Sequence, residues 1–327
     1  MSAAGRPDRK GDFARVAAVD CGTNTIRLLI AEEQPGGGLT DLVRELEIVR
    51  LGQGVDATGE LHPDALARTF AAAERFGERL RAYGVGPERT RLVATSATRD
   101  ARNVEDFFAG MTARLGVRPE VISGLEEARL SFTGALSGVP EGSAGPVLVM
   151  DIGGGSTELV LGDVAGQIDH AVSLNIGSVR LTERFGLVGP LTAEARAAAT
   201  AYVDGLLDGL DWPAGLLGRV GTWIGVAGTV TTLSALRQGL TTYDRSKVHG
   251  SVLTPDAISE LADRLAARSA DEIRGLGVPA GRADVVTAGA LIADRVAHHV
   301  RRPMIVSESD ILDGIALSLL ARPFRGS

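Results

Sequence analysis

The 327-residue sequence predicts an α/β protein of two lobes with a cleft between them. Its length and its hydrophobic content of 44% suffice for two cores, each in a lobe of about 100 to 200 residues. Two motifs, DCGTNTIR from Asp20 and DIGGGSTE from Asp151, stand 131 positions apart, and each follows a short apolar run. In each half, a group of strands precedes helices that alternate with strands. These observations indicate one architecture present twice.

The first half is predicted to begin with an antiparallel meander. Residues 15–32 have the pattern of a strand, a glycine turn and a second strand, and the glycines at 36–38 lead into a third strand at 42–50. Helical spacing and strand composition then alternate. The predicted elements are a helix at 63–81, a strand at 91–94, a helix at 104–115, a strand at 120–123 and a helix at 125–136.

The second half is predicted to repeat this order after the turn-rich segment 139–145. Strands are expected at 147–150, 158–161, 168–174 and 222–226, with a helix from Thr229. Helical patterns follow at 254–269, 280–301 and 310–320, with a short strand at 303–306. We therefore expect a flexible tail at 1–14, a first lobe at 15–136 and a second lobe at 137–327, with the terminal helix 308–321 packing back on the first lobe.

Two lobes of the order βββαβαβ describe the actin-like and ribonuclease-H-like (ASKHA) architecture. In such a protein the ligand lies in the cleft between the lobes, held by the first hairpin turn of each. The two motifs occupy these turns.

Composition narrows the class of function. The net charge is −7, and basic residues form no run longer than a pair, which argues against binding to duplex nucleic acid. A single cysteine, Cys21, excludes an intrachain disulfide and suits a reducing compartment. The polar residues 1–12 lack the apolar stretch of a signal peptide, and no run of about 18 apolar residues occurs. We expect a soluble cytoplasmic protein that binds no membrane.

The motif DIGGGSTE predicts a phosphate-binding turn. The glycines at 153–155 lose much chain entropy and pack nothing, so a ligand that needs bare backbone explains them better than a tight hairpin alone. Their N–H groups, with Ser156, can approach phosphate oxygens. Asp151, at the end of a strand, and Glu158, seven residues further on, can hold a divalent cation directly or through water.

The motif DCGTNTIR offers a second turn of the same kind. Asp20 is again placed to hold a cation, and residues 23–25 (Thr23, Asn24 and Thr25) can hold phosphate. Cys21 and Arg27 also match the C-x5-R spacing of cysteine-dependent phosphatases, whose loop is followed by a helix. Residues 26–30 instead have the composition of a strand, which favours Cys21 as a small packed residue.

Three further segments offer candidates with two interpretations each. Glu126 and Glu127 begin a helix, either as acids favoured by the helix dipole or with one of them as a general base. Arg99 follows a strand in a hydroxyl-rich turn, where it can bind phosphate or be solvated. Gly228 and Thr229 open a helix whose amides can hold phosphate, although turn chemistry alone also explains them.

Together these segments resemble the exopolyphosphatase and guanosine pentaphosphate phosphohydrolase (Ppx/GppA) family from about Val16 to Leu320. The segments that carry the resemblance are DCGTNTIR, TSATRDARN, ISGLEEARL, DIGGGSTE, GVAGTVTTL and GRADVVTAGAL. The pair ISGLEEARL and DIGGGSTE is the most specific of these signals.

The resemblance implies roles for the candidates. It makes Glu127 the general base, and Asp151 and Glu158 carboxylates of a Mg²⁺ (or Mn²⁺) site. It assigns phosphate binding to the turn residues 23–25, to Arg99, to the backbone from Gly153 to Ser156, and to Gly228 with Thr229. It also implies a homodimer, because members of this family are commonly dimers.

The resemblance implies an exopolyphosphatase that releases orthophosphate from the ends of inorganic polyphosphate. The 5′-phosphohydrolysis of guanosine pentaphosphate (pppGpp) and a nucleoside di- or triphosphatase activity are alternatives, because these substrates present the same terminal phosphoanhydride. A kinase of the same fold and a non-catalytic nucleotide-binding regulator are alternatives of another class. The chain resembles the short form of the family, without a C-terminal helical extension, and has Leu312 where the family often has arginine.

Overall fold

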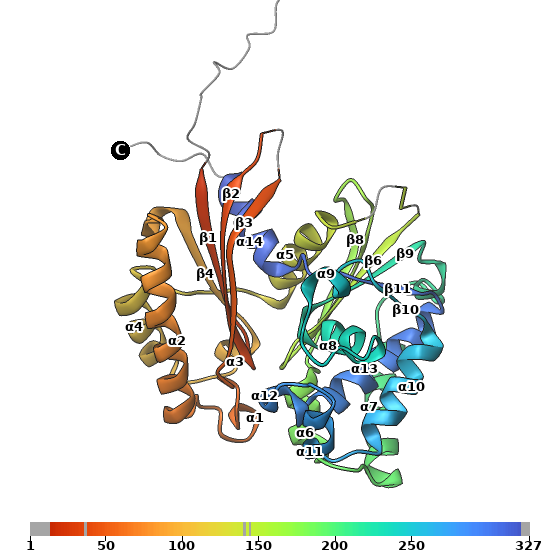
Figure 1. Cartoon of the computed structure of the whole chain (residues 1–327). Helices are drawn as coiled ribbons and strands as arrows, with labels where there is room; N and C mark the ends of the chain where they lie inside the picture. The colour runs from red at the N-terminus through yellow and green to blue at the C-terminus, as the bar shows by residue number, and fades with distance from the viewer. Residues whose placement is uncertain (1–13, 36–37, 140–141, 144, 322–327) are drawn as a thin grey trace, which may run out of the picture.

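The computed structural model describes residues 14–35, 38–139, 142–143 and 145–321. Figure 1 shows two lobes side by side, each built on one β-sheet with helices on both faces. The predicted tail at 1–14 falls almost wholly outside the described residues, and the turns at 36–38 and 139–145 fall partly outside them.

The first sheet has the strand order β3-β2-β1-β4-β5, in which β1, β2 and β3 form the predicted antiparallel meander. Strands β4 and β5 continue the sheet parallel to β1. The strands are β1 Arg15–Cys21, β2 Thr25–Glu33, β3 Leu39–Ile48, β4 Thr90–Ala94 and β5 Glu120–Val121. The helices are α1 Val55–Thr58, α2 Pro63–Ala82, α3 Ser96–Arg99, α4 Val104–Leu115 and α5 Gly124–Leu136, with a 3-10 turn at Pro87–Arg89.

The second sheet repeats this topology, because its order β8-β7-β6-β9-β11 matches that of the first, and β10 is added at the edge. The strands are β6 Val147–Ile152, β7 Thr157–Gly162, β8 Ile168–Leu174, β9 Thr222–Val226, β10 Val252–Leu253 and β11 Met304–Val306. The helices are α6 Ser178–Phe185, α7 Ala193–Asp208, α8 Ala227–Arg237, α9 Arg245–Val248, α10 Pro255–Ala266, α11 Ala270–Gly275, α12 Ala280–Ala283, α13 Val286–Val300 and α14 Ile311–Leu320, with a 3-10 turn at Leu217–Arg219. The predicted duplication is confirmed.

Several elements differ from the predicted bounds: β3 lies at Leu39–Ile48 rather than 42–50, α8 begins at Ala227 rather than Thr229, and α10 ends at Ala266 rather than 269. Two further differences have a local cause. The strand expected at 120–123 ends at Val121, because the Ser123 side chain caps α5 by accepting a hydrogen bond from the N–H of Glu126 (3.2 Å). The helix expected at 280–301 divides into α12 and α13, because the backbone of Val285 leaves the helical range at φ −123°.

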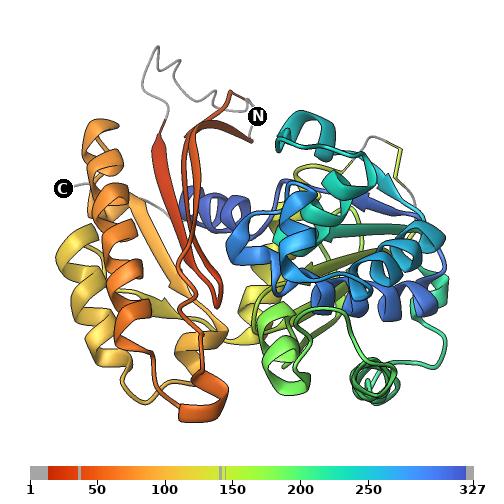
Figure 2. The same cartoon turned by 60° about the horizontal axis from the view of Figure 1, so that its bottom comes forward.

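Each central strand packs on both faces. In β1, Ala17, Val19 and Cys21 join the core beneath α2 and α4, whereas Val16 and Ala18 face α14. This alternation has the period of two that a strand imposes. The first sheet is therefore sandwiched between α2 with α4 on one side and α14 on the other, as Figures 1 and 2 show.

The helices α5 and α14 cross between the lobes. Helix α14, the last element described, packs on the first sheet, whereas α5 packs through Phe132 on the second sheet. Where they meet, a Cβ on Gly134 would overlap the carbonyl oxygen of Asp310, and a Cβ on Gly314 would overlap that of Leu130. Only glycine allows this backbone approach. The lobe boundary at residue 136 stays a prediction.

Replacing Gly134 with alanine should lower the free energy of unfolding by about 1–3 kcal/mol, because the added methyl group forces the backbones of α5 and α14 apart. Urea denaturation followed by circular dichroism measures the change. The matched control is Gly205→Ala in α7, where a Cβ meets nothing within 4 Å and alanine should be neutral or stabilising. Equal stability of Gly134→Ala and the wild type would contradict the proposed contact.

Candidate active site

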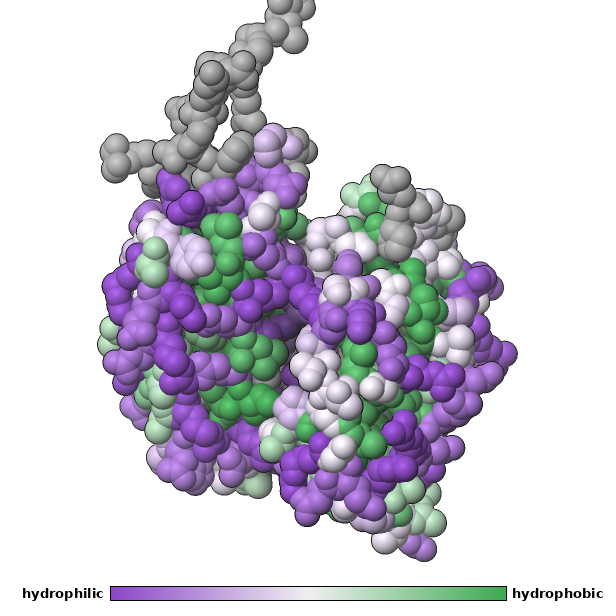
Figure 3. All heavy atoms as spheres, viewed as in Figure 1, coloured by the Kyte–Doolittle hydropathy of each residue, from purple (hydrophilic) through white to green (hydrophobic). Residues whose placement is uncertain are grey.

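The two motifs meet as facing turns in the cleft. A Cβ on Gly155 would lie 2.5 Å from both the Thr23 and the Ser96 hydroxyl oxygens, and one on Gly154 would lie 3.0 Å from Thr23 Cβ. The glycines are therefore required for the approach of the lobes as well as for bare backbone. The turns border a cavity of about 80 Å³, and Figure 3 shows a recess between the lobes with hydrophilic residues around it.

Most of the predicted site residues line this cavity. They are Asp20, Thr23, Asn24, Thr25, Glu127, Asp151, Gly153, Gly154, Gly155, Ser156, Gly228 and Thr229. Arg99 and Glu158 are not among the lining residues. The hydroxyl oxygen of Thr23 and the amide oxygen of Asn24 are buried without a hydrogen-bond partner in the described part of the chain. Such unpaired polar atoms are costly unless a ligand meets them.

Glu127 is held at the cleft by its helix and by Arg99. It lies in the first turn of α5, and its Oε2 accepts a hydrogen bond from Arg99 Nη1 (2.8 Å). The same nitrogen donates to the carbonyl oxygen of Ile122 (3.0 Å), so the guanidinium group of Arg99 is held at the start of α5. Arg99 does not line the cavity. Burial raises the pKa of Glu127 to about 7, against the effect of Arg99. A carboxyl with this pKa suits proton transfer near neutral pH.

Asp151 and Glu158 are neighbours across the β6–β7 hairpin. Ser131 Oγ of α5 donates to Asp151 Oδ2 (2.6 Å), and Ser173 Oγ donates to Glu158 Oε1 (2.7 Å). Burial raises the pKa of Asp151 to about 6 and that of Glu158 well above its usual range. Asp151 lines the cavity, whereas Glu158 is buried next to Asp151 and does not line the cavity.

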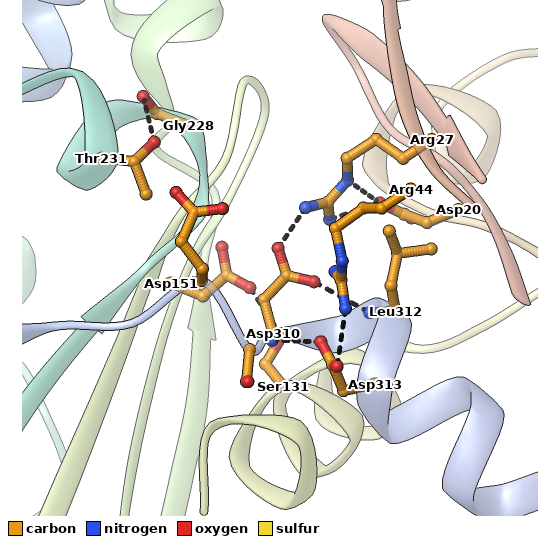
Figure 4. A network of polar contacts seen from close by, with 12 residues as sticks. Asp20, Arg27, Arg44, Ser131, Asp151, Gly228, Thr231, Asp310, Leu312 and Asp313 are labelled. Atoms are coloured by element: carbon orange, nitrogen blue, oxygen red, sulfur yellow. Dashed lines mark hydrogen bonds and ion pairs between the residues drawn. The ribbon is translucent and has the colours of Figure 1, made fainter. Parts of the chain in front are cut away.

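A chain of ion pairs occupies the opposite wall of the cleft, as Figure 4 shows. Arg27 Nη2 donates to Asp20 Oδ2 (2.6 Å), and its Nη1 pairs with Asp310, the cap residue of α14. Burial would lower the pKa of Arg27, but Asp310 and Asp20 raise it above its ordinary value. Beside them, Arg44 Nη2 donates to Asp313 Oδ1 (2.7 Å). One oxygen of Asp20 is thus engaged by arginine.

The side chains at the cavity suit a divalent cation that is bound partly by the protein and partly by the phosphate groups of a substrate. Within the described ranges, no group of three or more His, Cys, Asp or Glu side chains is arranged as a metal cage. Magnesium, however, is commonly bound by one or two carboxylates together with substrate phosphates and water. Asp151 and the unpaired amide oxygen of Asn24 are oxygen donors at the cavity that suit this mode of binding.

Arg27 and Arg282 also line the cavity. The sequence motifs had named Arg27 only as part of the C-x5-R spacing and had not singled out Arg282. Arg282 Nη1 donates to the carbonyl oxygen of Gly228 (3.2 Å) and to Thr232 Oγ1 (3.0 Å), and no described carboxylate forms an ion pair with it. Burial lowers its pKa. A buried guanidinium without a carboxylate partner is a ready anion-binding group. Both arginines lie in segments that carry the family resemblance, DCGTNTIR and GRADVVTAGAL. Membership in these segments is the sequence signal that could have predicted them as site residues.

Comparison with known proteins identifies the relationship. The sequence profile of the Ppx/GppA phosphatase family matches residues 29–322. The chain belongs to this family. It is therefore a phosphatase, and hence a hydrolase.

Relatives of the Ppx/GppA family align along nearly the whole chain. Exopolyphosphatase 2 of Mycobacterium tuberculosis is 46% identical over 324 residues, which cover 94% of this chain and 99% of the relative. The crystal structure of an exopolyphosphatase-like protein is 40% identical, with a TM-score of 0.87 over 93% of this chain and 98% of that one. The Ppx/GppA protein of Aquifex aeolicus is 32% identical, with a TM-score of 0.78 over 94% and 98%. This agreement confirms the two-lobe actin-like fold.

A second cavity, of about 440 Å³, adjoins the first in this Ppx/GppA protein. The two cavities share Arg27, Gly228 and Arg282. One part of the wall of the second cavity is apolar and includes Ile48, Leu236, Leu240, Leu276, Val278 and Leu312, whereas charged residues such as Arg44, Arg245 and Glu308 line the rest. Leu312, the departure from the family pattern, is fully buried and makes this wall apolar. None of the helices in the described ranges combines the length and the apolar character needed to cross a membrane.

Cys21 is a packed core residue. It ends β1 at 1% exposure, and the segment after the turn is strand β2 rather than a helix. Burial, with a further effect of Asp20, raises the pKa of its thiol well above the ordinary value. A buried thiol of high pKa is a poor nucleophile. The interpretation of Cys21 as a small residue packed at a strand end is confirmed.

Replacing Cys21 with serine should therefore leave the turnover of phosphoanhydrides within about threefold of the wild type, since an essential nucleophile would cost several orders of magnitude more. Phosphate release under saturating substrate measures it, and a melting curve checks that the variant is folded. Complete loss of turnover in a folded Cys21→Ser protein would refute the assignment.

Proposed function

We propose that this protein is an exopolyphosphatase, which hydrolyses the terminal phosphoanhydride of inorganic polyphosphate and releases orthophosphate. The observation that carries the proposal is the position of Glu127, a carboxyl with a pKa of about 7 that lines the same cavity as both phosphate turns. The 46% identity to a protein named exopolyphosphatase 2 over almost the whole chain supports it.

In the proposed mechanism, Glu127 accepts the proton of a water molecule as that water attacks the terminal phosphorus in line. Arg99 orients the carboxylate, because its hydrogen bond to Oε2 leaves Oε1 for the water. The backbone of the Gly153–Ser156 turn and the side chains of Thr23, Asn24 and Thr25 hold the phosphoryl oxygens. Gly228 and Thr229, with Arg282 beside them, face the bound chain from the other side of the cavity.

We infer that Mg²⁺ (or Mn²⁺) is the cofactor. Asp151 is the residue that would hold it directly, and Glu158 and the free oxygen of Asp20 would reach it through water. Bound there, the cation would neutralise charge on the transferred phosphoryl group. It would also offset the repulsion among Glu127, Asp151 and Asp20, which contributes to the raised pKa of Glu127.

A second candidate substrate is a nucleoside polyphosphate such as pppGpp. The second cavity favours it, because the apolar part of its wall, next to a phosphate site, suits a base and its sugar. A nucleoside di- or triphosphatase activity has the same support. The cytoplasmic location and the homodimer expected from the family stay predictions.

Replacing Glu127 with glutamine should retain the fold and lower kcat by at least about 10²-fold, the lower range for removing a general base. Phosphate release from long polyphosphate, tripolyphosphate and pppGpp is measured side by side, with and without magnesium. The matched control is Glu126→Gln, because Glu126 lies in the same helical turn but pairs with Arg91 (2.6 Å).

The same measurements decide between the substrates. Turnover of polyphosphate with none of pppGpp supports the first candidate, and the reverse result supports the second. Wild-type turnover by Glu127→Gln would refute its role as the base.

Replacing Asp151 with asparagine should shift the magnesium titration of activity to concentrations at least about tenfold higher, because one charged ligand is lost. Binding of Mn²⁺ to the protein with a non-hydrolysable polyphosphate analogue, followed by electron paramagnetic resonance, gives a second reading. Asp169→Asn, on the outer strand β8, serves as the control. An unshifted titration would count against Asp151 as a ligand.

A further inference from the structure

Arg180 joins the two phosphate turns. It lies in the first turn of α6 in the second lobe, and its side chain is only 14% exposed. Its Nε donates to the carbonyl oxygen of Gly155 (2.8 Å), and its Nη2 donates to Ser96 Oγ (3.1 Å). Gly155 belongs to the turn of the second lobe and Ser96 to the first lobe, and both line the proposed active site. One guanidinium therefore bridges the cleft at its phosphate end.

Two carboxylates of the first lobe complete the contact. Nη1 of Arg180 pairs with Asp56 Oδ1 in α1 (2.5 Å), and Nη2 pairs with Asp100 Oδ2 at the end of α3 (2.5 Å). A planar guanidinium can serve these acceptors together because it presents five N–H groups in a fixed fork. A lysine at this position would carry the charge but could not span the same set.

The contact also orients one peptide unit of the phosphate turn. In a trans peptide, the carbonyl group and the following N–H point in opposite directions. Because the Gly155 carbonyl is engaged by Arg180, the N–H of Ser156 points away from the arginine. Ser156 lines the cavity, so this N–H is available to a phosphoryl oxygen there.

We propose that Arg180 is a positioning residue for phosphoryl transfer, which closes the two lobes in register and fixes the Gly155–Ser156 peptide toward the substrate. The inference deepens the proposed function and rests on it. One turn further along α6, Glu183 Oε1 accepts a hydrogen bond from the N–H of Gly54 (3.2 Å), which adds a second link between the lobes. Without the arginine, the carboxylates of Asp56 and Asp100 would lose the cation that pairs with both of them.

The closure is tested by measuring the distance between the lobes in the free protein. Glu78→Cys in α2 and Arg264→Cys in α10 place exposed thiols on the two lobes, whereas the native Cys21 is buried and stays unlabelled. Double electron–electron resonance between spin labels then gives a distance distribution. Arg180→Met should broaden it and shift its mean to longer distances. Arg196→Met, which removes a surface ion pair with Asp263 within the second lobe, should leave it unchanged.

Kinetics supply the second reading. The apparent affinity for substrate falls in proportion to the fraction of molecules in the closed form. Arg180→Met should therefore raise the KM for polyphosphate by about tenfold or more, which is the effect of losing charge-assisted hydrogen bonds. Its kcat should fall by a smaller factor, because saturating substrate restores closure. Asp100→Asn removes the charge of one half-exposed partner of Arg180, a change that the fold should tolerate. It should raise the KM by a smaller factor than Arg180→Met does.

A lower melting temperature of Arg180→Met with unchanged distances and KM would overturn the proposal, since that pattern belongs to a purely structural ion pair. Should Arg180→Met fail to fold, Asp100→Asn with wild-type distances and KM would overturn it equally. If the wild type hydrolyses no phosphoanhydride, the proposed function fails, while the label distances still show whether Arg180 closes the lobes.

Discussion

The backbone contact between α5 and α14 is the constraint on which the rest of the cleft depends. Each helix packs on the sheet of the opposite half of the chain, and the two cross where Gly134 and Gly314 leave no room for a side chain. Helix α5 carries Glu127 and, one turn later, Ser131, which holds Asp151. The cap of α14 supplies Asp310, which holds Arg27. The crossing therefore places the proposed base, the proposed metal ligand and the arginine wall together.

Burial of many charges in one cleft is the second constraint. Removing carboxylates from water is costly unless each has a partner. Asp20 and Asp310 share Arg27, and Glu127 has Arg99. Within the described ranges, the hydrogen-bond partner of Asp151 is a serine hydroxyl, and no arginine pairs with it directly. Asp151 is therefore the cavity carboxylate least compensated by the protein. A cation carried with a phosphate chain would supply the missing charge.

The proposed anion-binding groups and the proposed metal ligands are thus different side chains of the same cleft. Arg282, which forms no ion pair with a described carboxylate, and the unpaired hydroxyl group of Thr23 can donate hydrogen bonds to a phosphate chain. The unpaired amide oxygen of Asn24 is an acceptor and suits a cation instead. Arg27 and Arg99 are already committed to carboxylates, so they chiefly order the site. The second cavity adjoins the same cleft, which is why we propose both a phosphate chain and a nucleoside polyphosphate as candidate substrates.

The sequence by itself determined the strand meanders, the alternating helices and the two glycine turns, because these follow from local periodicity and from the cost of glycine in a strand. It also singled out Asp151, which ends a strand beside such a turn, and the pair Glu126 and Glu127, of which the family resemblance selected Glu127. Only the tertiary structure decided that Arg99 binds Glu127 rather than facing the cavity, that Glu158 stands behind Asp151, and that Arg180 bridges the lobes. Pairs of charges far apart in sequence leave no periodic signal, so packing alone settles which of them neutralise each other and which remain for a ligand.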